Sequence, residues 1–242
     1  DVDRVARVPA DLVRRLSEAR SAAFGAWAEA KEGDDYASFA PHLRTLLDLT
    51  LEQMAAIDDD RHPYDVALEA YDPGTTVDTL RPMFGRLREG LVELLDAIAG
   101  AAPIAPQAFP VPVAVQRTVH HQIAEALGYD FQAGRLDESA HPFTINLGPG
   151  DVRITTFYDP SDLLAGLGGT IHEVGHALYE QGLPRDALGG TGLDRYASMG
   201  LHESQSRLWE NAIGRSAAFN TWMSGLLREH LGGDAPSGDA LF

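Results

Sequence analysis

Apolar residues in the first half of the chain recur at steps of three and four, which is the spacing of one face of an α-helix. A first series, after Pro9, contains Leu12, Leu16, Ala19, Ala23, Trp27 and Ala30. A second contains Phe39, Leu43, Leu46, Leu47, Met54 and Ile57. A third, with Thr76 in position to cap it, contains Leu80, Phe84, Leu87, Leu91, Leu94 and Ile98. These series predict three amphipathic helices, and Val113–Leu127 predicts a further helix that ends at Gly128.

The pattern changes near residue 141, where two short segments alternate between apolar and polar positions. Phe143–Leu147 and Val152–Phe157 have a period of two, and the turn residues Gly148-Pro149-Gly150 separate them. Alternation on both sides of such a turn predicts a β-hairpin. Two long helices are expected after the hairpin, from about Ser161 to Gln181 and from about Ser198 to Leu231.

These elements predict a mainly α fold with a minor β element. Residues 1–128 are expected to form an N-terminal helical region, and residues 129–242 a region with the hairpin and the last two helices, in one continuous domain. No apolar run approaches the roughly 20 residues of a transmembrane helix, and no signal peptide is visible after Asp1. The charged start and the Gly- and Ser-containing residues 232–242 predict that the sequence is truncated at both ends.

Charge and cysteine content exclude several classes of function. Lys and Arg number 19 and Asp and Glu number 36, which gives a formal net charge of −17. Such an acidic chain lacks the basic face that nucleic acid or an anionic membrane surface requires, so we expect neither as a partner. Because the chain contains no cysteine, any metal must be held by His, Asp or Glu. We expect a cytoplasmic location.

The segment from Thr170 to Tyr179 contains the pattern H-E-x-x-H, formed by His172, Glu173 and His176. Residues four apart lie on one face of a helix, with Cβ atoms about 6 Å apart, so both imidazoles can bind one Zn²⁺. Glu173 then lies beside the metal, where its carboxylate can take a proton from water. The pattern predicts zinc-dependent hydrolysis, and the preceding hairpin offers an edge strand to an extended peptide. The alternative is a buried pair of structural histidines.

A catalytic zinc needs a third protein ligand and one open coordination position. Glu203 follows His176 at a distance that allows a turn, a loop and a return helix. Spacing favours Glu203 only slightly over its competitors, which are His202, Asp194, Glu180 and Glu210. Glu180 lies too far along the helix axis for the same metal, so we expect a supporting role. Glu210 either orients a ligand histidine or pairs with Arg207 or Arg215.

Other polar or flexible side chains are expected to be structural. His120 and His121 lie in a polar stretch of a predicted helix, which favours the surface. The methionines occupy helical apolar positions and are expected in the core; they are Met54, Met83, Met199 and Met223. Tyr179 follows the second histidine on the same helix and is expected to pack near the metal site or beneath it.

Four motifs follow one another in the second half of the chain. They are His141-Pro142-Phe143, Asp151–Thr155, His172–His176 and His202–Gln205. Through these motifs the sequence resembles the carboxypeptidase Taq family of metallocarboxypeptidases, and the similarity covers essentially the whole chain. The resemblance implies a zincin-like helical metalloprotease core with a small β-hairpin sheet before the H-E-x-x-H helix. It also implies release of residues from the free C-termini of peptides, a divalent metal (zinc or cobalt) and a homodimer.

The resemblance also assigns roles to individual residues. The implied metal ligands are His172, His176 and Glu203, and Glu173 is the implied general base and acid. The implied contacts in the substrate groove are His141, Arg153 and Thr155. For Arg153, the chemistry leaves two partners open, a substrate carboxylate or the neighbouring Asp151.

Members of the family are longer than this sequence. They carry further motifs of the forms I-R-x-E-A-D-E and Q-D-x-H-W, which are not among these 242 residues. We therefore expect a metallocarboxypeptidase, with a non-catalytic or weakly active metal-binding protein as the alternative. A metallo-endopeptidase or aminopeptidase with the same metal site is a third hypothesis, although the sequence offers no evident pocket for a peptide amine.

Overall fold

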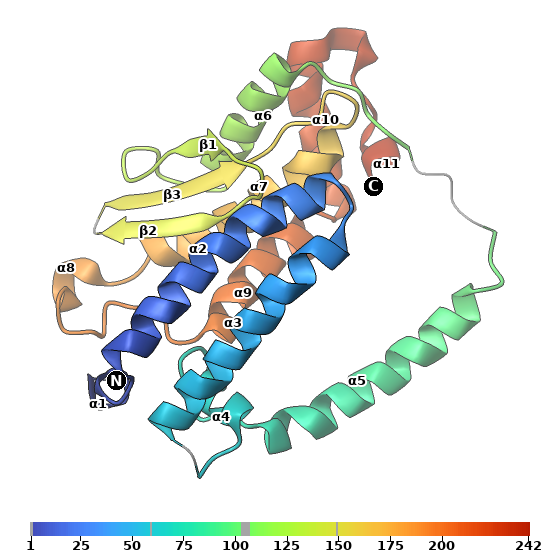
Figure 1. Cartoon of the computed structure of the whole chain (residues 1–242). Helices are drawn as coiled ribbons and strands as arrows, with labels where there is room; N and C mark the ends of the chain where they lie inside the picture. The colour runs from blue at the N-terminus through green and yellow to red at the C-terminus, as the bar shows by residue number, and fades with distance from the viewer. Residues whose placement is uncertain (1, 59, 103–106, 149) are drawn as a thin grey trace. The chain divides into compact units, whose positions relative to one another are not determined.

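The computed structural model describes residues 2–58, 60–102, 107–148 and 150–242 (Figure 1). These residues form a mainly helical structure with one three-stranded sheet, which confirms the expected fold class. They divide into two compact units, residues 1–101 and 102–242. This boundary differs from the division expected after residue 128, because the helix Val113–Ala126 packs on helices of the second unit. No helix in the described ranges is long and apolar enough to cross a membrane.

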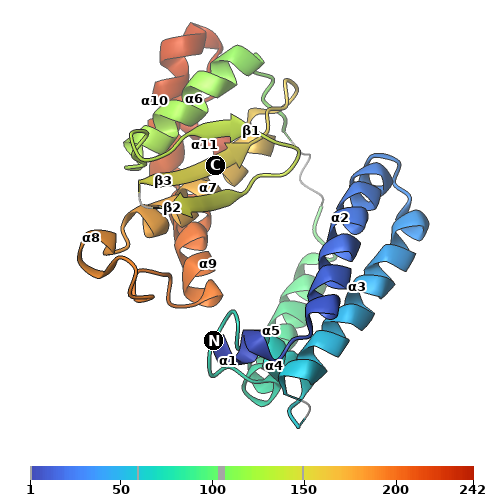
Figure 2. The same cartoon turned by 60° about the vertical axis from the view of Figure 1, so that its left-hand side comes forward.

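The first unit is built around a pair of long helices. Helices α2 (Ala10–Glu32) and α3 (Tyr36–Ile57) lie side by side in both views (Figures 1 and 2). Their contact is a small core of Leu12, Leu16 and Leu49, of which the helical spacing predicts Leu12 and Leu16 but not Leu49. Asp35 caps α3 by accepting a hydrogen bond from the Ser38 backbone N–H. Two short helices, α1 (Val2–Ala6) and α4 (Pro63–Leu68), complete this part of the unit.

Helix α5 (Val77–Ile98) begins where the sequence predicts it, with the Thr76 side chain accepting a hydrogen bond from the Thr79 backbone N–H. None of its residues is buried. Eight of its large apolar side chains are 42–59% exposed; they are Met83, Phe84, Leu87, Leu91, Val92, Leu94, Leu95 and Ile98. The expectation that Met83 lies in the core is therefore wrong.

The second unit contains all three strands and the remaining helices. Its longer elements are α6 (Val113–Ala126), β1 (Leu136–Glu138), β2 (Thr144–Gly148), β3 (Asp151–Thr156), α7 (Leu163–Gln181), α9 (Met199–Arg207) and α10 (Ala217–Leu231). Its shorter elements are α8 (Arg185–Leu188), the π-helical turn η1 (Leu208–Ile213), the 3₁₀ turn η2 (Gly232–Asp234) and α11 (Gly238–Leu241).

The sheet has the strand order β1-β3-β2. The predicted hairpin is confirmed, since β2 and β3 pair antiparallel with Thr144 opposite Ile154 and Asn146 opposite Val152. Gly150, with φ of 74°, adopts the left-handed conformation that the turn requires, while Pro149 lies outside the described residues. The short strand β1, which pairs parallel to β3, was not predicted. Within the described residues β2 is an edge strand whose outer side is unpaired.

Helix α7 is buried on two sides, which explains its nearly continuous apolar sequence. Val174 and Ala177 pack against Val152 and Ile154 of β3. On another side, Leu163, Leu167 and Ile171 join a core with α6 and α10. The buried residues that these two helices contribute are Val119, Ile123, Phe219, Met223 and Leu227. Each leucine buried in this way stabilises the fold by about 1.5–3 kcal/mol before the entropy cost. The helix that carries the H-E-x-x-H pattern is thus held rigidly.

Three expectations about this unit are wrong. The single helix expected from Ser198 to Leu231 is interrupted by η1 and by a break before Ser216, whose side chain caps α10. His120 is completely buried, because α6 turns it toward α7, whereas His121 is exposed as expected and stacks on Phe131. Met199 is 38% exposed, whereas Met223 is buried as expected, as is Met54 of α3 in the first unit.

Candidate metal centre

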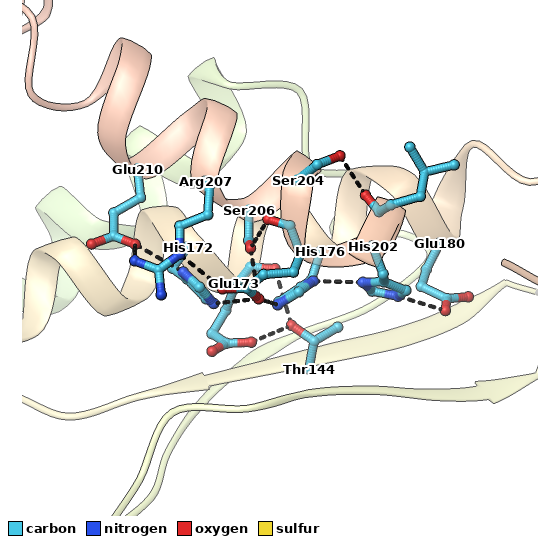
Figure 3. Close-up of polar contacts among 12 residues, drawn as sticks. Thr144, His172, Glu173, His176, Glu180, His202, Ser204, Ser206, Arg207 and Glu210 are labelled. Atoms are coloured by element: carbon cyan, nitrogen blue, oxygen red, sulfur yellow. Dashed lines mark hydrogen bonds and ion pairs between the residues drawn. The ribbon is translucent and has the colours of Figure 1, made fainter. Parts of the chain in front are cut away.

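Three side chains from two helices converge on one point of the second unit, and two of them, His172 and His176, are labelled in Figure 3. His172 and His176 lie one turn apart on α7, and Glu203 projects from α9. The Glu203 Oε2 atom is 3.6 Å from His172 Nε2 and 3.3 Å from His176 Nε2. All three potential ligand atoms lie within 4.8 Å of one another.

These distances fit a tetrahedral metal site. Donor atoms bonded to Zn²⁺ at about 2.0–2.1 Å are about 3.3 Å apart when the geometry is tetrahedral. The donor set of two imidazoles and one carboxylate suits a borderline metal such as zinc and leaves one position open for water or substrate. In the described ranges this is the one group of three His, Asp or Glu side chains with such a spacing.

The hydrogen bonds around His172 orient its ring for metal binding. Its Nδ1 atom lies 2.9 Å from Glu210 Oε2. Since a carboxylate accepts, Nδ1 carries the proton and Nε2 presents a lone pair toward Glu203. Glu210 is itself held by Arg215, at 2.8 Å from Oε1. The structure therefore supports both sequence-based alternatives for Glu210 at once.

His176 is oriented through a second histidine. Its Nδ1 atom lies 2.5 Å from Nδ1 of His202, and Nε2 of His202 lies 2.9 Å from Glu180 Oε1. Burial, followed by the neighbouring histidines, lowers the pKa of His176 to about 4. The ring is therefore neutral near pH 7, the form in which imidazole binds metals.

Glu203 is ionised and fixed in place. Arg207 Nε donates to Glu203 Oε1 at 2.8 Å, and Ser206 Oγ donates to Oε2 at 3.1 Å. Burial acts to raise the pKa of Glu203, but these hydrogen bonds and the adjacent His172 outweigh it, so the pKa lies below its usual value. A negatively charged carboxylate is the form that a divalent cation needs.

Glu173 lies beside the three converging atoms, between α7 and β2. The Thr144 hydroxyl is 2.6 Å from Glu173 Oε2. Burial raises the pKa of the Glu173 carboxyl, although the hydrogen bond from Thr144 and the nearby His172 and His141 act in the opposite direction. A raised pKa makes this carboxylate a better proton acceptor than an ordinary glutamate.

Gly175 allows the two metal-binding helices to approach one another. A Cβ atom at this position would lie 2.6 Å from Ser206 Cα and 2.9 Å from the Gln205 carbonyl oxygen. Any larger residue would push α9 away from α7. The glycine inside the H-E-x-x-H pattern is thus what lets Glu203 reach the histidines.

The three residues expected in a substrate groove lie in two different places. His141 is exposed and close enough to Glu173 to affect its pKa. Thr155 and Arg153 lie on the sheet face opposite to Val152 and Ile154, and so away from α7. Arg153 pairs with Asp151 through two 2.8 Å contacts, and the Thr155 hydroxyl accepts from the Phe143 backbone N–H at 2.9 Å.

Some residues of the site were not singled out from the sequence. Thr144 and Asn146 reach Glu173 and Glu180 from β2, and Ser206 supports Glu203. The alternation in β2 does place Thr144 and Asn146 on one face, but only the position of α7 shows that this face meets the two glutamates. The supporting position expected for Glu180 and the nearby packing expected for Tyr179 agree with their contacts to His202.

The fold and this geometry are those of a candidate metal site of the zincin type, in which H-E-x-x-H and a glutamate from the following helix face one another. Residues 1–240 match the family described as Carboxypeptidase Taq (M32) metallopeptidase, and the chain belongs to that family. Membership implies a divalent metal cofactor, and the three converging side chains fit one.

Named relatives agree with this assignment. Thermostable carboxypeptidase 1 of Thermus thermophilus is 43% identical over 90% of this chain and 45% of its own length. Carboxypeptidase 1 of Bacillus subtilis is 41% identical over 81% of this chain and 40% of its own length. The structure of the M32 carboxypeptidase from Deinococcus radiodurans superposes with a TM-score of 0.83 at 36% identity, covering 97% of this chain and 48% of that one. The chain thus spans less than half the length of the relatives it matches.

Proposed function

We propose that this chain carries the metal-binding part of a carboxypeptidase that removes residues from the free C-termini of peptides. The observation that carries the proposal is the convergence of His172, His176 and Glu203 on one point, with Glu173 beside them. Zinc is the proposed metal, with cobalt as a substitute, because two imidazoles and one carboxylate suit both ions.

A divalent metal in this position would lower the pKa of water to about 7 and polarise the scissile carbonyl. Glu173 accepts the proton of the attacking water on its carboxylate, and Thr144 fixes that carboxylate through Oε2. Burial raises the pKa of Glu173, which favours the protonated carboxyl that passes the proton to the leaving amine. Glu210 keeps the His172 ring in position throughout.

The peptide is proposed to lie along β2. No described residue pairs with the outer side of this edge strand, which leaves backbone groups for a peptide, and Thr144 of the same strand contacts Glu173. His141 is the proposed substrate contact nearest to Glu173. For Arg153 and Thr155 a substrate contact remains a prediction, since Arg153 pairs with Asp151 of the same strand and the Thr155 hydroxyl accepts from the Phe143 backbone N–H.

The names of the matched relatives support carboxypeptidase activity and do not favour the alternative of a non-catalytic metal-binding protein. The other expectations remain predictions: a cytoplasmic location, a homodimer, and the absence of nucleic acid and membrane partners.

A pair of peptides tests the proposal. We expect the zinc-loaded chain to shorten a peptide stepwise from its free C-terminus and to leave the C-terminally amidated twin intact, as followed by mass spectrometry. Glu173→Gln should retain zinc and lose about 10²–10⁴-fold in turnover, the usual contribution of a general base. Internal cleavage would instead indicate an endopeptidase, and one bound zinc without turnover would support the non-catalytic alternative.

A further inference from the structure

His202 and Glu203 are consecutive residues of α9 that contact opposite nitrogens of the same ring. Glu203 faces His176 Nε2, where the proposed metal ligands converge. His202 contacts His176 Nδ1 on the other side of the ring (Figure 3). His202 is only 8% exposed. It is not a member of the converging group itself. The contact of His202 with His176 is therefore its link to the metal site.

Glu180 is the last residue in the series of contacts from His176 through His202, and it determines where the protons lie on both rings. The Glu180 carboxylate accepts, so His202 Nε2 carries a proton and donates it at 2.9 Å. His202 Nδ1 then presents a lone pair, which accepts from His176 Nδ1–H. With its proton on Nδ1, His176 presents the lone pair of Nε2 toward Glu203 and the metal position.

The surroundings hold both supporting residues in this arrangement. Glu180 Oε2 accepts from Asn146 Nδ2 and from Arg185 Nη2, each at 2.6 Å. The His202 ring meets the rings of Tyr179 and Tyr196 edge to face, with centroids 5.2 and 5.1 Å away. Glu180 thus keeps its charge directed at His202 and has little freedom to reach His176 itself.

We propose that His202 is a positioning residue, which with Glu180 fixes His176 in the tautomer that binds the metal. His172 receives a carboxylate directly from Glu210, whereas His176 receives one through the intervening imidazole. This inference rests on the metal site of the proposed function. The tautomer that it assigns to His176 is already present in the metal-free protein.

The first test measures the tautomer in the zinc-free 242-residue chain. Two-bond ¹⁵N–¹H correlation spectra at pH 8, where imidazoles are neutral, show which ring nitrogen carries the proton. We expect the proton of His176 on Nδ1 in the wild type and a mixture of both tautomers in His202→Leu. His202→Asn, whose side-chain carbonyl can replace the Nδ1 acceptor, should restore the Nδ1–H form. A purely structural role of His202 would not move this signal between two folded variants.

The second test measures zinc affinity by competition with a chelator. His202→Leu should bind zinc about 10–100-fold more weakly, the usual effect of removing a supporting partner of a metal ligand. His202→Asn should recover most of this loss. The control is His121→Leu, which removes an exposed histidine stacked on Phe131 and should leave the affinity unchanged.

Two results would overturn the inference. One is a spectrum in which His176 of the wild type carries its proton on Nε2. This measurement does not depend on whether His202→Leu folds. The other is a folded His202→Leu with wild-type zinc affinity. If the wild type binds no zinc, the proposed function fails, while the tautomer of His176 still decides the role of His202.

Discussion

His120 is completely buried, and its chemistry depends on that burial more than on any partner. Its Nδ1 atom lies 2.8 Å from the Thr170 hydroxyl, which in turn contacts Thr156 of β3 at 2.7 Å. Its Nε2 atom has no hydrogen-bond partner among the described residues. Burial lowers the pKa of His120 to about 4, because a charged imidazole would lose its hydration.

This lowered pKa predicts a pH dependence of stability. The unfolded chain protonates His120 near its ordinary pKa of about 6.5, so between that value and about 4 the unfolded state binds more protons than the folded one. Stability therefore falls as the pH drops through this window. From pH 7 to pH 5 the free energy of unfolding should fall by about 2 kcal/mol more in the wild type than in His120→Gln.

Urea unfolding of the two zinc-free proteins at both pH values measures this difference. Both samples retain His176, so its own titration cancels in the comparison. An equal loss of stability in the wild type and in His120→Gln would show that His120 does not resist protonation in the folded state.

At the residue scale, the sequence predicts what depends on local spacing. His172, Glu173 and His176 follow from positions along one helix. Spacing favours Glu203 over His202 as the third metal ligand only slightly, and the choice of Glu203 rests on the family resemblance. The structure shows why, since both residues contact the same imidazole and only the rotation of α9 determines which nitrogen each one meets. The burial of His120 was missed because the polar residues around it outweighed Val119 and Ile123, whose buried face of α6 it shares.

At the scale of elements, the metal site depends on the close approach of α7 and α9. Gly175 is the contact point, since a Cβ atom there would lie only 2.6 Å from Ser206 Cα. Gly175→Ala should destabilise the second unit by about 1–3 kcal/mol, as overpacking usually does, and should weaken zinc binding because Glu203 moves away. Thermal unfolding and chelator competition measure the two effects.

Gly168→Ala on the same helix is the matched control. A Cβ atom at Gly168 meets nothing within 4 Å, so this variant should keep its zinc affinity and gain up to about 1 kcal/mol from helix propensity. Equal behaviour of the two alanine variants would contradict the account of the helix contact.

The elements that the sequence predicts best are those with long, regular patterns. Helices α2, α3, α5 and α7 begin and end close to the expected residues. Strand β1 was missed because it has three residues and exists only through its pairing with β3. The break between α9 and α10 was missed because apolar spacing continues through it, while the π-helical turn that places Glu210 against His172 arises from tertiary contacts.

At the scale of the whole chain, all members of the metal site belong to the second unit. Zinc should therefore stabilise α7 and α9, which it joins, by about 4 kcal/mol when its free concentration is 1,000 times the dissociation constant. Hydrogen exchange measures this as slower opening of α7 and α9 amides, with the amides of α2 and α3 as an internal reference. Equal protection in both units, or none in α7, would show that the metal does not join these helices.

The most direct test of the central claim is a crystal structure of the zinc-loaded chain with an anomalous difference map at the zinc edge. We predict one strong peak within about 2.0–2.2 Å of His172 Nε2, His176 Nε2 and a carboxylate oxygen of Glu203. A peak bound elsewhere, or a zinc ion that leaves Glu203 outside its coordination sphere, would contradict the account.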